Sequence, residues 1–592
     1  MREVDRLTTE HYAVPSLLLM ETAANASARA IAARFSDDVS GLRMLILCGR
    51  GNNGGDGAAL ARLLSFKGAR VEVVLFGRVE DAHGDARTNF EAARSLASAV
   101  PETGPDSAHE TAPASPWKTA AASRLSFTEC TDDAAWRDFR AAHRDYDVIV
   151  DALFGTGLTR PLEGIYAGVV RYLAQIRDAR HATSAAGTSA ADMSNVERSG
   201  GSKSAAGRPL IVSLDLPSGL NADTAALIGD AVQADLTVTF TAPKPANVLP
   251  PASYHGGELL IAPIGSPAVL LDATASQLFL TEEQDARVWL EQTRYRPASY
   301  KNTHGHALVV AGSRRMSGAA VLCGDAAMRS GAGLVTIASP ASALSAIAAR
   351  VMPEVMTAEL VETTEENSAH GNERILGKTA IEQVLQLAAR ADAIAIGPGL
   401  TSAEHVRRLV RAVVERRACP VVIDADGLNA LSPWPADLRG TPEAPLILTP
   451  HPGEMRRLLG ADAEQNSLDD RVRTAREFAV AHEVFVVSKG ARVLIAAPDG
   501  RVAVNPTGNA GTGTAGAGDT LTGIVTGCIA QSRGAFGKDA DAYAATVAAV
   551  YLAGLAADLT AVSQGMRTLV ASDISRYFGA AVRALDPDGE RP

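Results

Sequence analysis

The chain has 592 residues, which is too long for one hydrophobic core and predicts several domains. Its composition is that of a soluble globular protein, and its formal net charge of −11 disfavours nucleic acid or an anionic membrane as the main partner. The five cysteines form no Cys-x-x-Cys pair, no apolar run reaches the length of a membrane span, and the first residues do not resemble a signal peptide. We therefore expect a cytoplasmic enzyme without a zinc site or a disulfide framework.

Apolar runs typical of buried strands alternate with helical patterns in the first half of the chain. Strands are predicted at 44–48, 71–75, 146–150, 210–214 and 236–240. Helical patterns such as 58–67 and 164–177 fall between them. This alternation predicts a parallel sheet wrapped by helices.

The same alternation returns in the second half. Strands are predicted there at 307–311, 334–337, 393–396, 421–423, 446–448, 484–487 and 493–495. A Pro- and Gly-rich passage at 243–267 and an amphipathic segment at 281–292 separate the halves, so we place the boundary near residue 280 and predict domains 1–280 and 281–592. The stretches 101–122 and 181–207 could not bury a core, and we predict that both are mobile surface loops.

A glycine-rich turn follows the first predicted strand. The segment 49–57 reads Gly-Arg-Gly-Asn-Asn-Gly-Gly-Asp-Gly, and a helix is expected after it. Open α/β sheets bind ligands at the carboxyl ends of their strands, where such a turn can cradle an anion. The Asn pair and Asp56 add directed polar groups that a simple turn does not need.

Two more strands of the first half end in polar groups. Asp151 begins Asp-Ala-Leu-Phe-Gly-Thr-Gly-Leu, and Asp215 begins Asp-Leu-Pro-Ser-Gly-Leu. An Asp at a strand end is often only a turn-capping residue. Three polar strand ends that converge on one edge of a sheet favour a binding site instead.

These three motifs resemble those of the NAD(P)HX epimerase domain, and the N-terminal Met-Arg-Glu-Val-Asp and Pro-Ser-Leu-Leu-Leu-Met-Glu fit the same family. Members of that family interconvert the R and S forms of hydrated NADH or NADPH and bind a potassium ion. The resemblance implies that Asp215 is the main acid/base group, and that Asn53, Asp151 and Ser218 ligate K⁺ through hard oxygen donors. It further implies that the hydrated cofactor is held by Asn52, Asn53, Gly54, Gly55, Asp56, Gly155, Thr156, Gly157, Leu158, Thr159, Arg160, Pro161 and Asp215.

In the second half, the segment 505–519 is a run of small residues that ends in one carboxylate, Asp519, and an apolar helix follows. A backbone without bulky side chains can approach an anion closely, and the start of a helix adds unpaired N–H groups. The Lys-Ser/Thr ending of a P-loop is absent, so this is a different motif. The pattern predicts phosphate chemistry with Asp519 as a base.

Two further features of the second half point to binding. His451 lies between two prolines that hold it rigidly, although it could be a simple loop residue. Lys489 precedes a glycine at a strand end, where it could be a solvated charge or could bind phosphate.

From about Tyr300 to about Ala580 the chain resembles the ADP- or ATP-dependent NAD(P)HX dehydratases, a branch of the ribokinase-like fold. With the first half, it resembles the bifunctional NAD(P)H-hydrate repair enzymes. The resemblance implies two three-layer αβα domains, a Rossmann-like epimerase domain and a ribokinase-like dehydratase domain. In that chemistry, the terminal phosphoryl group of the nucleotide moves to the C6 hydroxyl of the hydrate, and elimination restores the dihydropyridine.

The resemblance also implies the partners and the remaining roles. Expected partners are NADHX and NADPHX, ADP or ATP with Mg²⁺, K⁺ and further copies of the chain in a homo-oligomer. Asp519 would remove the hydroxyl proton. The adenine nucleotide would be held by Lys489, Gly490, Ala491, Arg492, Val493 and Gly518. The hydrated cofactor would contact Ala332, Gly333, Gly399, His451 and Asp519.

Two alternative functions stay open at this point. A small-molecule kinase fused to a non-catalytic binding domain would share the Gly-Ala-Gly-Asp loop of sugar and vitamin kinases. A partner-binding scaffold, as in RNA decapping, would share the fold of the first half, but its Asp56, Asp151 and Asp215 and the acidic net charge disfavour it. One departure from the dehydratases is Thr401, where glycine is frequent. The sequence does not decide between ADP and ATP, or between NADHX and NADPHX.

Overall fold

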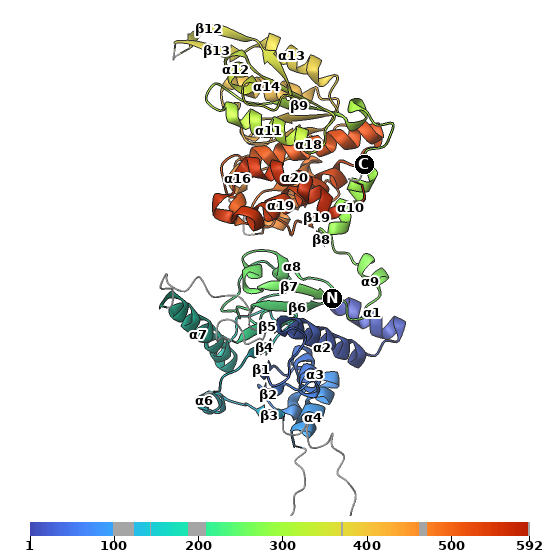
Figure 1. Cartoon of the computed structure of the whole chain (residues 1–592), viewed down its shortest axis with the longest axis vertical. Coiled ribbons are helices and arrows are strands. Elements are labelled where there is room, and N and C mark those ends of the chain that lie inside the picture. The colour runs from blue at the N-terminus through green and yellow to red at the C-terminus, as the bar shows by residue number, and fades with distance from the viewer. Residues whose placement is uncertain (99–123, 143, 187–208, 369–370, 461–469, 590–592) are drawn as a thin grey trace, which may run out of the picture. The chain divides into compact units, whose positions relative to one another are not determined.

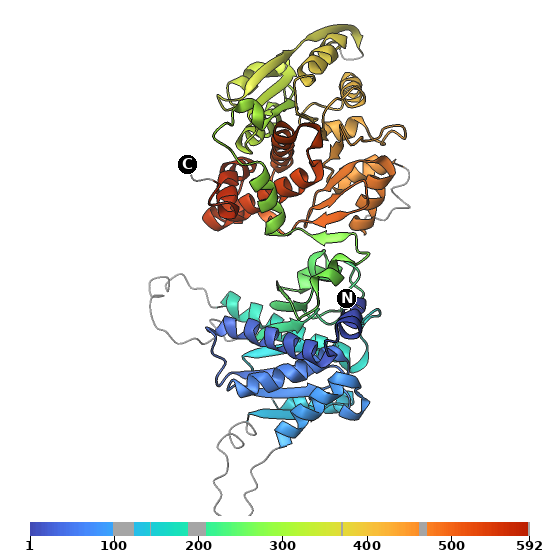
Figure 2. The same cartoon turned by 90° about the vertical axis from the view of Figure 1, so that its right-hand side faces the viewer.

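The computed structural model describes residues 1–98, 124–142, 144–186, 209–368, 371–460 and 470–589. These residues form two compact units, Met1–Ala275 and Ser276–Pro592. Each unit is an α/β structure with helices on both faces of a sheet (Figure 1, Figure 2). The predicted loop at 101–122 lies outside the described residues. Most of the predicted loop at 181–207 also lies outside the described residues. Its first residues, up to Ala186, belong to the helix that precedes it.

Unit 1 is built on a seven-stranded sheet of order β3-β2-β1-β4-β5-β6-β7 in which every neighbouring pair is parallel. The strands are β1 (Arg43–Cys48), β2 (Arg70–Leu75), β3 (Leu125–Glu129), β4 (Val148–Ala152), β5 (Leu210–Leu214), β6 (Leu236–Phe240) and β7 (Glu258–Ala262). The central strands are buried on both faces, which is why they read as continuous apolar runs in the sequence.

Two hydrophobic cores fill unit 1, one on each face of its sheet. Met44 and Ile46 of β1 pack with helices α2 (Ser16–Ala32), α3 (Asn52–Phe66) and α4 (Gly84–Ser98). The alternate residues Leu45 and Leu47 pack on the other side with α6 (Asp133–Ala141) and α7 (Gly164–Ala186). The short helices of this unit are α1 (Arg2–Tyr12), α8 (Pro245–Val248) and α9 (Ala268–Asp272).

Unit 2 contains a ten-stranded sheet of order β11-β10-β9-β14-β15-β16-β17-β18-β19-β8. Its strands are β8 (Leu278–Leu280), β9 (His306–Val310), β10 (Leu334–Pro340), β11 (Met356–Leu360), β14 (Ala393–Ile396), β15 (Val421–Ile423), β16 (Leu446–Leu448), β17 (Phe485–Ser488), β18 (Leu494–Ala496) and β19 (Val502–Val504). The pairs from β11 to β17 are parallel, and β18 is antiparallel to both of its neighbours. A separate hairpin joins β12 (Glu362–Ser368) to β13 (Gly371–Leu376).

The largest core of unit 2 lies between its sheet and α10 (Glu283–Gln292), α11 (Ser317–Arg329), α18 (Ala517–Phe536), α19 (Ala542–Gln564) and α20 (Ala571–Leu585). The remaining helices are α12 (Ala341–Ala348), α13 (Lys378–Ala388), α14 (Glu404–Glu415), α15 (Asp426–Ala430), α16 (Pro452–Leu459) and α17 (Arg471–His482). Helix α19 is long and apolar enough to span a membrane by composition, but 67% of its most apolar window is buried inside the unit. It is therefore a core helix of unit 2.

The predicted α/β class with a parallel sheet in each half is confirmed. The strands expected in the first half are β1, β2, β4, β5 and β6, with ends that differ by no more than two residues. The sequence did not reveal β7, because this edge strand is half exposed and lies inside the Pro- and Gly-rich passage. Helix α3 begins at Asn52, so the glycine-rich segment itself forms the first turns.

Helices α11 and α18 approach each other through glycine. A Cβ atom added to Gly523 of α18 would overlap the carbonyl oxygen of Cys323 in α11. One added to Gly527 would lie 2.6 Å from the carbonyl oxygen of Ala327. This close packing fixes the position of α18, whose first turn carries Asp519.

We predict that Gly523→Ala destabilises unit 2 by about 1 to 3 kcal/mol, because the new methyl group meets backbone that cannot move aside. Gly579→Ala is the matched control on α20, since its methyl group would meet only the end of the Arg583 side chain at 3.6 Å. Calorimetric unfolding should show a lower Tm for Gly523→Ala only. Equal Tm values for the two variants would contradict this account of the packing.

Candidate functional site

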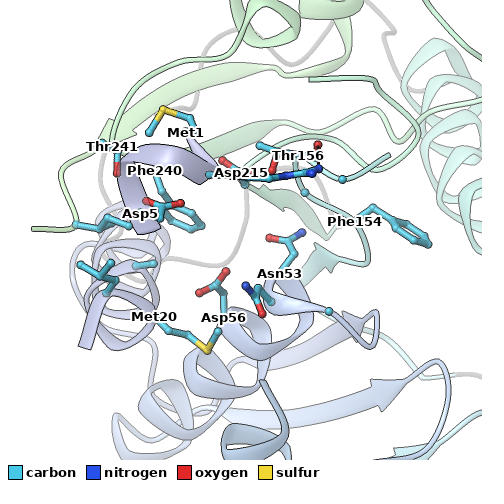
Figure 3. A pocket seen from close by; sticks show the side chains of 18 of the residues that line it. Met1, Asp5, Met20, Asn53, Asp56, Phe154, Thr156, Asp215, Phe240 and Thr241 are labelled. Carbon is cyan, nitrogen blue, oxygen red and sulfur yellow. Dashed lines mark hydrogen bonds between the residues drawn. The ribbon is translucent and has the colours of Figure 1, made fainter. Parts of the chain in front are cut away.

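A cavity of about 580 Å³ lies at the carboxyl edge of the sheet in unit 1 (Figure 3). The turns after β1, β4 and β5 contribute to its wall, together with α1 and α2. The three polar strand ends singled out in the sequence therefore do meet at one edge. The residues of the expected site that line the cavity are Asn52, Asn53, Asp56, Gly155, Thr156, Gly157 and Asp215.

Other residues expected to hold the hydrated cofactor lie elsewhere. A Cβ atom on Gly54 would overlap the carbonyl oxygen of Gly49, and one on Gly55 would lie 2.7 Å from the Cα atom of Ala86. These two glycines thus allow close packing of the chain. The residues Leu158, Thr159, Arg160 and Pro161 do not line the cavity.

Asp215 is held by a network that sequence reasoning did not find. Lys244 is only 5% exposed, and its ammonium group forms an ion pair with Asp215 Oδ1. The same group donates to Thr239 Oγ1 at 2.9 Å and to the Phe240 carbonyl oxygen at 3.0 Å. The Asp215 backbone has φ +66°, a conformation that costs energy for a residue other than glycine. Lys244 lies between two prolines, which is the one signal in the sequence that could have indicated it.

Two more carboxylates face the cavity beside Asp215. Figure 3 shows Asp5 of α1 and Asp56 of α3 on opposite sides of the same space. Burial and the nearby charges of Asp215 and Asp5 raise the pKa of Asp56 well above its usual range, and Lys244 opposes this shift. Burial also raises the pKa of Asp5, whose Oδ1 atom is buried without a hydrogen-bond partner. The cavity thus combines a carboxylate paired with lysine and carboxyl groups that favour their protonated form.

Asp151 lies beneath the cavity, fully buried. Its oxygens accept from Ser218 Oγ at 2.6 Å, Ser218 N at 2.8 Å, Ser213 Oγ at 2.9 Å and Leu153 N at 3.3 Å. Burial raises the pKa of Asp151, while these four donors act in the opposite direction. Asp151 and Ser218 are therefore in contact, and they join the ends of β4 and β5.

Asn53 is the third residue expected to bind potassium. It is 9% exposed, and both atoms of its side-chain amide are buried without a partner. Its side chain points into the cavity (Figure 3). Hydroxyl, amide and carboxylate oxygens are ligands that suit a hard cation. Within the described ranges, no group of three or more His, Cys, Asp and Glu side chains could hold a metal ion.

The corresponding edge of unit 2 is organised around Asp424, which follows β15 and is 1% exposed. Asp424 accepts from Lys489 Nζ at 2.7 Å and from Thr522 Oγ1 at 2.7 Å. Burial acts to raise the pKa of Asp424, but Lys489 and the hydroxyl donors outweigh it and hold the pKa below its usual range. This carboxylate stays ionised and connects the end of β17 to α18.

Asp519 lies in the first turn of α18, next to this pair. Burial, together with the negative charge of Asp424, raises the pKa of Asp519 to about 6, and Lys489 acts in the opposite direction. A Cβ atom on Gly518 would lie 3.2 Å from Lys489 Nζ and 3.6 Å from Asp424 Oδ2. Lys489, Gly518 and Asp519 are therefore brought together, as the sequence predicted. A carboxylate with this pKa is suited to accept a proton near neutral pH.

His451 is the N-cap residue of α16. Its Nδ1 atom accepts from Gly453 N at 3.0 Å, and its side chain is about half exposed. Its Nε2 atom lies 3.5 Å from Glu454 Oε1, and Glu454 Oε2 lies 3.8 Å from Lys489 Nζ. His451 thus adjoins the Asp424–Lys489–Asp519 cluster through Glu454.

The loop 489–493, where nucleotide binding is expected, is held by Arg471 of α17. The Arg471 guanidinium donates to the carbonyl oxygens of Ala491 at 2.8 Å, Ser488 at 3.1 Å and Lys489 at 3.3 Å. Nothing in the sequence around Arg471 distinguishes it from a surface arginine. The contact depends on the fold and could not be found from spacing.

The residues of unit 2 that are expected to contact the hydrated cofactor do not all lie at the same edge of the sheet. Gly399 has φ +65°, follows β14 at the carboxyl edge, and packs against the Met316 carbonyl oxygen at the start of α11. Thr401 has φ +80°, which accounts for the glycine that is frequent at this position. Ala332 and Gly333 precede β10 and lie at the amino edge, close to Lys301, so the single chain does not bring them together with Asp519.

Comparisons with known proteins agree with this division. A family model described as the YjeF-related protein N-terminus matches residues 16–246, and one described as NAD(P)H-hydrate dehydratase matches residues 307–579.

Two full-length relatives carry the description bifunctional NAD(P)H-hydrate repair enzyme Nnr. The one from Moorella thermoacetica is 36% identical over 591 residues, covering 100% of this chain and 97% of that relative. The one from Thermofilum pendens is 34% identical, covering 99% and 96%. A Bacillus subtilis ADP/ATP-dependent NAD(P)H-hydrate dehydratase crystallised with ATP and Mg²⁺ is 32% identical. The match covers 52% of this chain and 100% of that one, with a TM-score of 0.42. The chain therefore belongs to the family of bifunctional NAD(P)H-hydrate repair enzymes, with an epimerase-type unit followed by a dehydratase-type unit.

Proposed function

We propose that the chain repairs hydrated nicotinamide cofactors in two steps. The epimerase domain, residues 1–280, interconverts R- and S-NAD(P)HX. The dehydratase domain, residues 281–592, converts the S form to NAD(P)H at the expense of ADP, giving AMP and phosphate. One observation carries the proposal: at the carboxyl edge of each sheet a carboxylate lies close to a lysine, Asp215 beside the buried Lys244 in unit 1 and Asp519 beside the Asp424–Lys489 pair in unit 2.

In unit 1, epimerisation inverts C6: a donor protonates the C6 hydroxyl, which leaves as water, and water then adds to the opposite face of the ring and gives a proton to an acceptor. Asp215 is the acceptor, because its carboxylate lines the cavity and is held in place by its ion pair with Lys244. Asp56 is the donor, because burial and the neighbouring carboxylates raise its pKa well above its usual range. The two residues approach the cavity from the turn after β5 and from α3, and can act on a ring held between them (Figure 3).

Potassium fits the oxygen atoms found near this cavity. Asn53, Asp151 and Ser218 would hold it, and the unpartnered amide of Asn53 is the observation that favours a ligand there. When bound, the ion supplies positive charge near the carboxylates and the phosphates of the substrate.

In unit 2, Asp519 takes the proton of the C6 hydroxyl as the hydroxyl oxygen attacks the terminal phosphorus of the nucleotide. The N–H groups at the start of α18 and the ammonium of Lys489 face the charge that develops on the phosphoryl oxygens. Loss of the C5 proton and departure of phosphate from C6 then form the double bond of NAD(P)H. Mg²⁺ needs only one or two carboxylates in addition to the phosphates, and Asp519 and Glu454 are the candidates near Lys489.

The loop 489–493, clamped by Arg471, would hold the adenine nucleotide, together with Gly518. Gly399 and His451 would contact the hydrated cofactor. A homo-oligomer, a cytoplasmic location and the absence of nucleic acid and membrane partners stay predictions.

The direct test is recovery of NADH from a mixture of R- and S-NADHX with ADP and Mg²⁺, followed at 340 nm. We expect recovery of the whole mixture. Asp519→Asn should abolish recovery while leaving R–S exchange intact, and Asp215→Asn should limit recovery to the S form. A phosphorylated hydrate that accumulates without NADH would instead support the small-molecule kinase. No reaction with ADP or ATP would overturn the dehydratase assignment.

The pH dependence of unit 2 provides a second prediction. Asp519 must be ionised to accept a proton, and its pKa of about 6 lies above the usual range. We therefore expect kcat/KM for S-NADHX to be constant above this pH and to fall about tenfold per pH unit below it. A profile that stays flat down to pH 4.5 would contradict the role of Asp519 as base.

A third prediction concerns the Lys244–Asp215 pair. Lys244→Met leaves Asp215 buried without its counter-charge and should destabilise unit 1 by about 3 to 5 kcal/mol. Adding Asp215→Asn removes that charge and should restore most of the stability measured by calorimetric unfolding, but not epimerisation. Failure of the double variant to regain stability would show that Lys244 does not act through Asp215.

A further inference from the structure

Arg50 occupies the second position of the glycine-rich turn, and its side chain lines the cavity of unit 1. Among the described residues it has no ion pair and no side-chain hydrogen bond. Its stem crosses the turn after β2: a Cβ atom on Gly77 would lie 2.5 Å from Arg50 Cδ and 2.7 Å from Arg50 Cγ. Gly77 has φ +137°, a conformation that favours glycine. Because it has no side chain, it leaves room for the stem of Arg50. The side chain thus lies against the turn after β2 and lines the cavity, and its guanidinium has no hydrogen-bond partner among the described residues.

The segment β1–α3–β2 has the order of a dinucleotide-binding unit. In such units the pyrophosphate lies at the N-terminus of the helix, and the adenosine ribose lies near the end of the second strand. Gly51, Asn52 and Asn53 at the start of α3 line the cavity, as the first part of this arrangement requires. The ribose of a bound dinucleotide would then lie beside Gly77.

The residues that directly follow β2 carry no acidic side chain. A site that selects the unphosphorylated ribose places an acidic side chain near the second strand to accept from the 2′-hydroxyl. Here β2 is followed by Phe76, Gly77 and Arg78. The next acidic residues are Glu80, which pairs with Arg94 at 2.9 Å, and Asp81. Neither of them lines the cavity; Asp85 in the first turn of α4 does, and its carboxylate accepts a hydrogen bond from Ser16 Oγ.

We propose that Arg50 binds the 2′-phosphate of hydrated NADPH and makes unit 1 selective for NADPHX over NADHX. This inference rests on the proposed epimerase function of unit 1. A phosphate monoester carries up to two negative charges and three acceptor oxygens, which the guanidinium can engage through two parallel hydrogen bonds. Because the stem of Arg50 already lies against Gly77, little side-chain freedom is lost on binding.

The test uses the full chain with Asp519→Asn, so that unit 2 does not consume the product. Conversion of pure R-NADPHX and R-NADHX to the S forms is followed by chromatography. We expect kcat/KM to favour NADPHX by about tenfold or more, chiefly through KM. Arg50→Gln should remove this preference and Arg50→Lys should keep part of it. The matched control Arg70→Gln changes an exposed arginine at the opposite end of β2 and should leave the ratio unaltered.

Equal kcat/KM for the two substrates would overturn the proposal, as would equal losses on both substrates in Arg50→Gln. If neither hydrate is epimerised, the proposed function of unit 1 fails instead. Calorimetric titration with NADP⁺ and NAD⁺ still decides the role of Arg50 in that case. A loss of NADP⁺ affinity in Arg50→Gln alone would support it, and an unchanged affinity would overturn it.

Discussion

A carboxylate buried at the end of a parallel strand must be given donors or a counter-charge, because an uncompensated charge in the interior costs several kcal/mol. Both units satisfy this constraint at the carboxyl edge of the sheet. In unit 1, Asp151 accepts hydrogen bonds from the backbone N–H and the hydroxyl of Ser218 and from the hydroxyl of Ser213. In unit 2, Asp424 accepts hydrogen bonds from the ammonium of Lys489 and the hydroxyl of Thr522. These contacts hold the loops that carry the proposed chemistry.

Each anchored carboxylate has a second one near it with fewer fixed donors. Asp215 begins the turn that Asp151 anchors through Ser218, and Asp519 lies one helical turn before Thr522, which bonds Asp424. The division of roles follows from the surroundings. A carboxylate saturated with donors is structural, whereas one that is partly desolvated and close to other negative charges exchanges its proton near neutral pH. Unit 2 shows this most clearly, since the pKa of Asp424 is lowered and that of Asp519 is raised.

Much of this edge could be predicted from the sequence, because strands buried on both faces read as apolar runs and the polar residues follow directly after them. The turns at Asn53, Asp151 and Asp215 were found in this way, and Asp519 was found from the run of small residues that precedes its helix. Lys244 was missed because its partner Asp215 is distant in the sequence and the pairing depends on how the loop after β6 folds back.

Arg471 was missed for a similar reason. Its hydrogen-bond acceptors are backbone carbonyl oxygens, which every residue has, so no residue pattern in the sequence indicates the contact. The edge strand β7, which is mostly exposed, and the strand β19, which has only three residues, were not recognised either. Ala332 and Gly333 stay predicted contacts of the hydrated cofactor. The fold places them directly before β10, at the amino end of that strand.

The central claim is that each unit holds a complete active site and that the two act in sequence on one metabolite. It is tested most directly by mixing two inactive chains, one with Asp215→Asn and one with Asp519→Asn, and supplying pure R-NADPHX with ADP and Mg²⁺. Neither chain alone should form NADPH faster than the spontaneous R–S exchange allows, whereas the mixture should convert all of the hydrate. If the mixture stays as slow as the single variants, the two sites are not independent and the account is wrong.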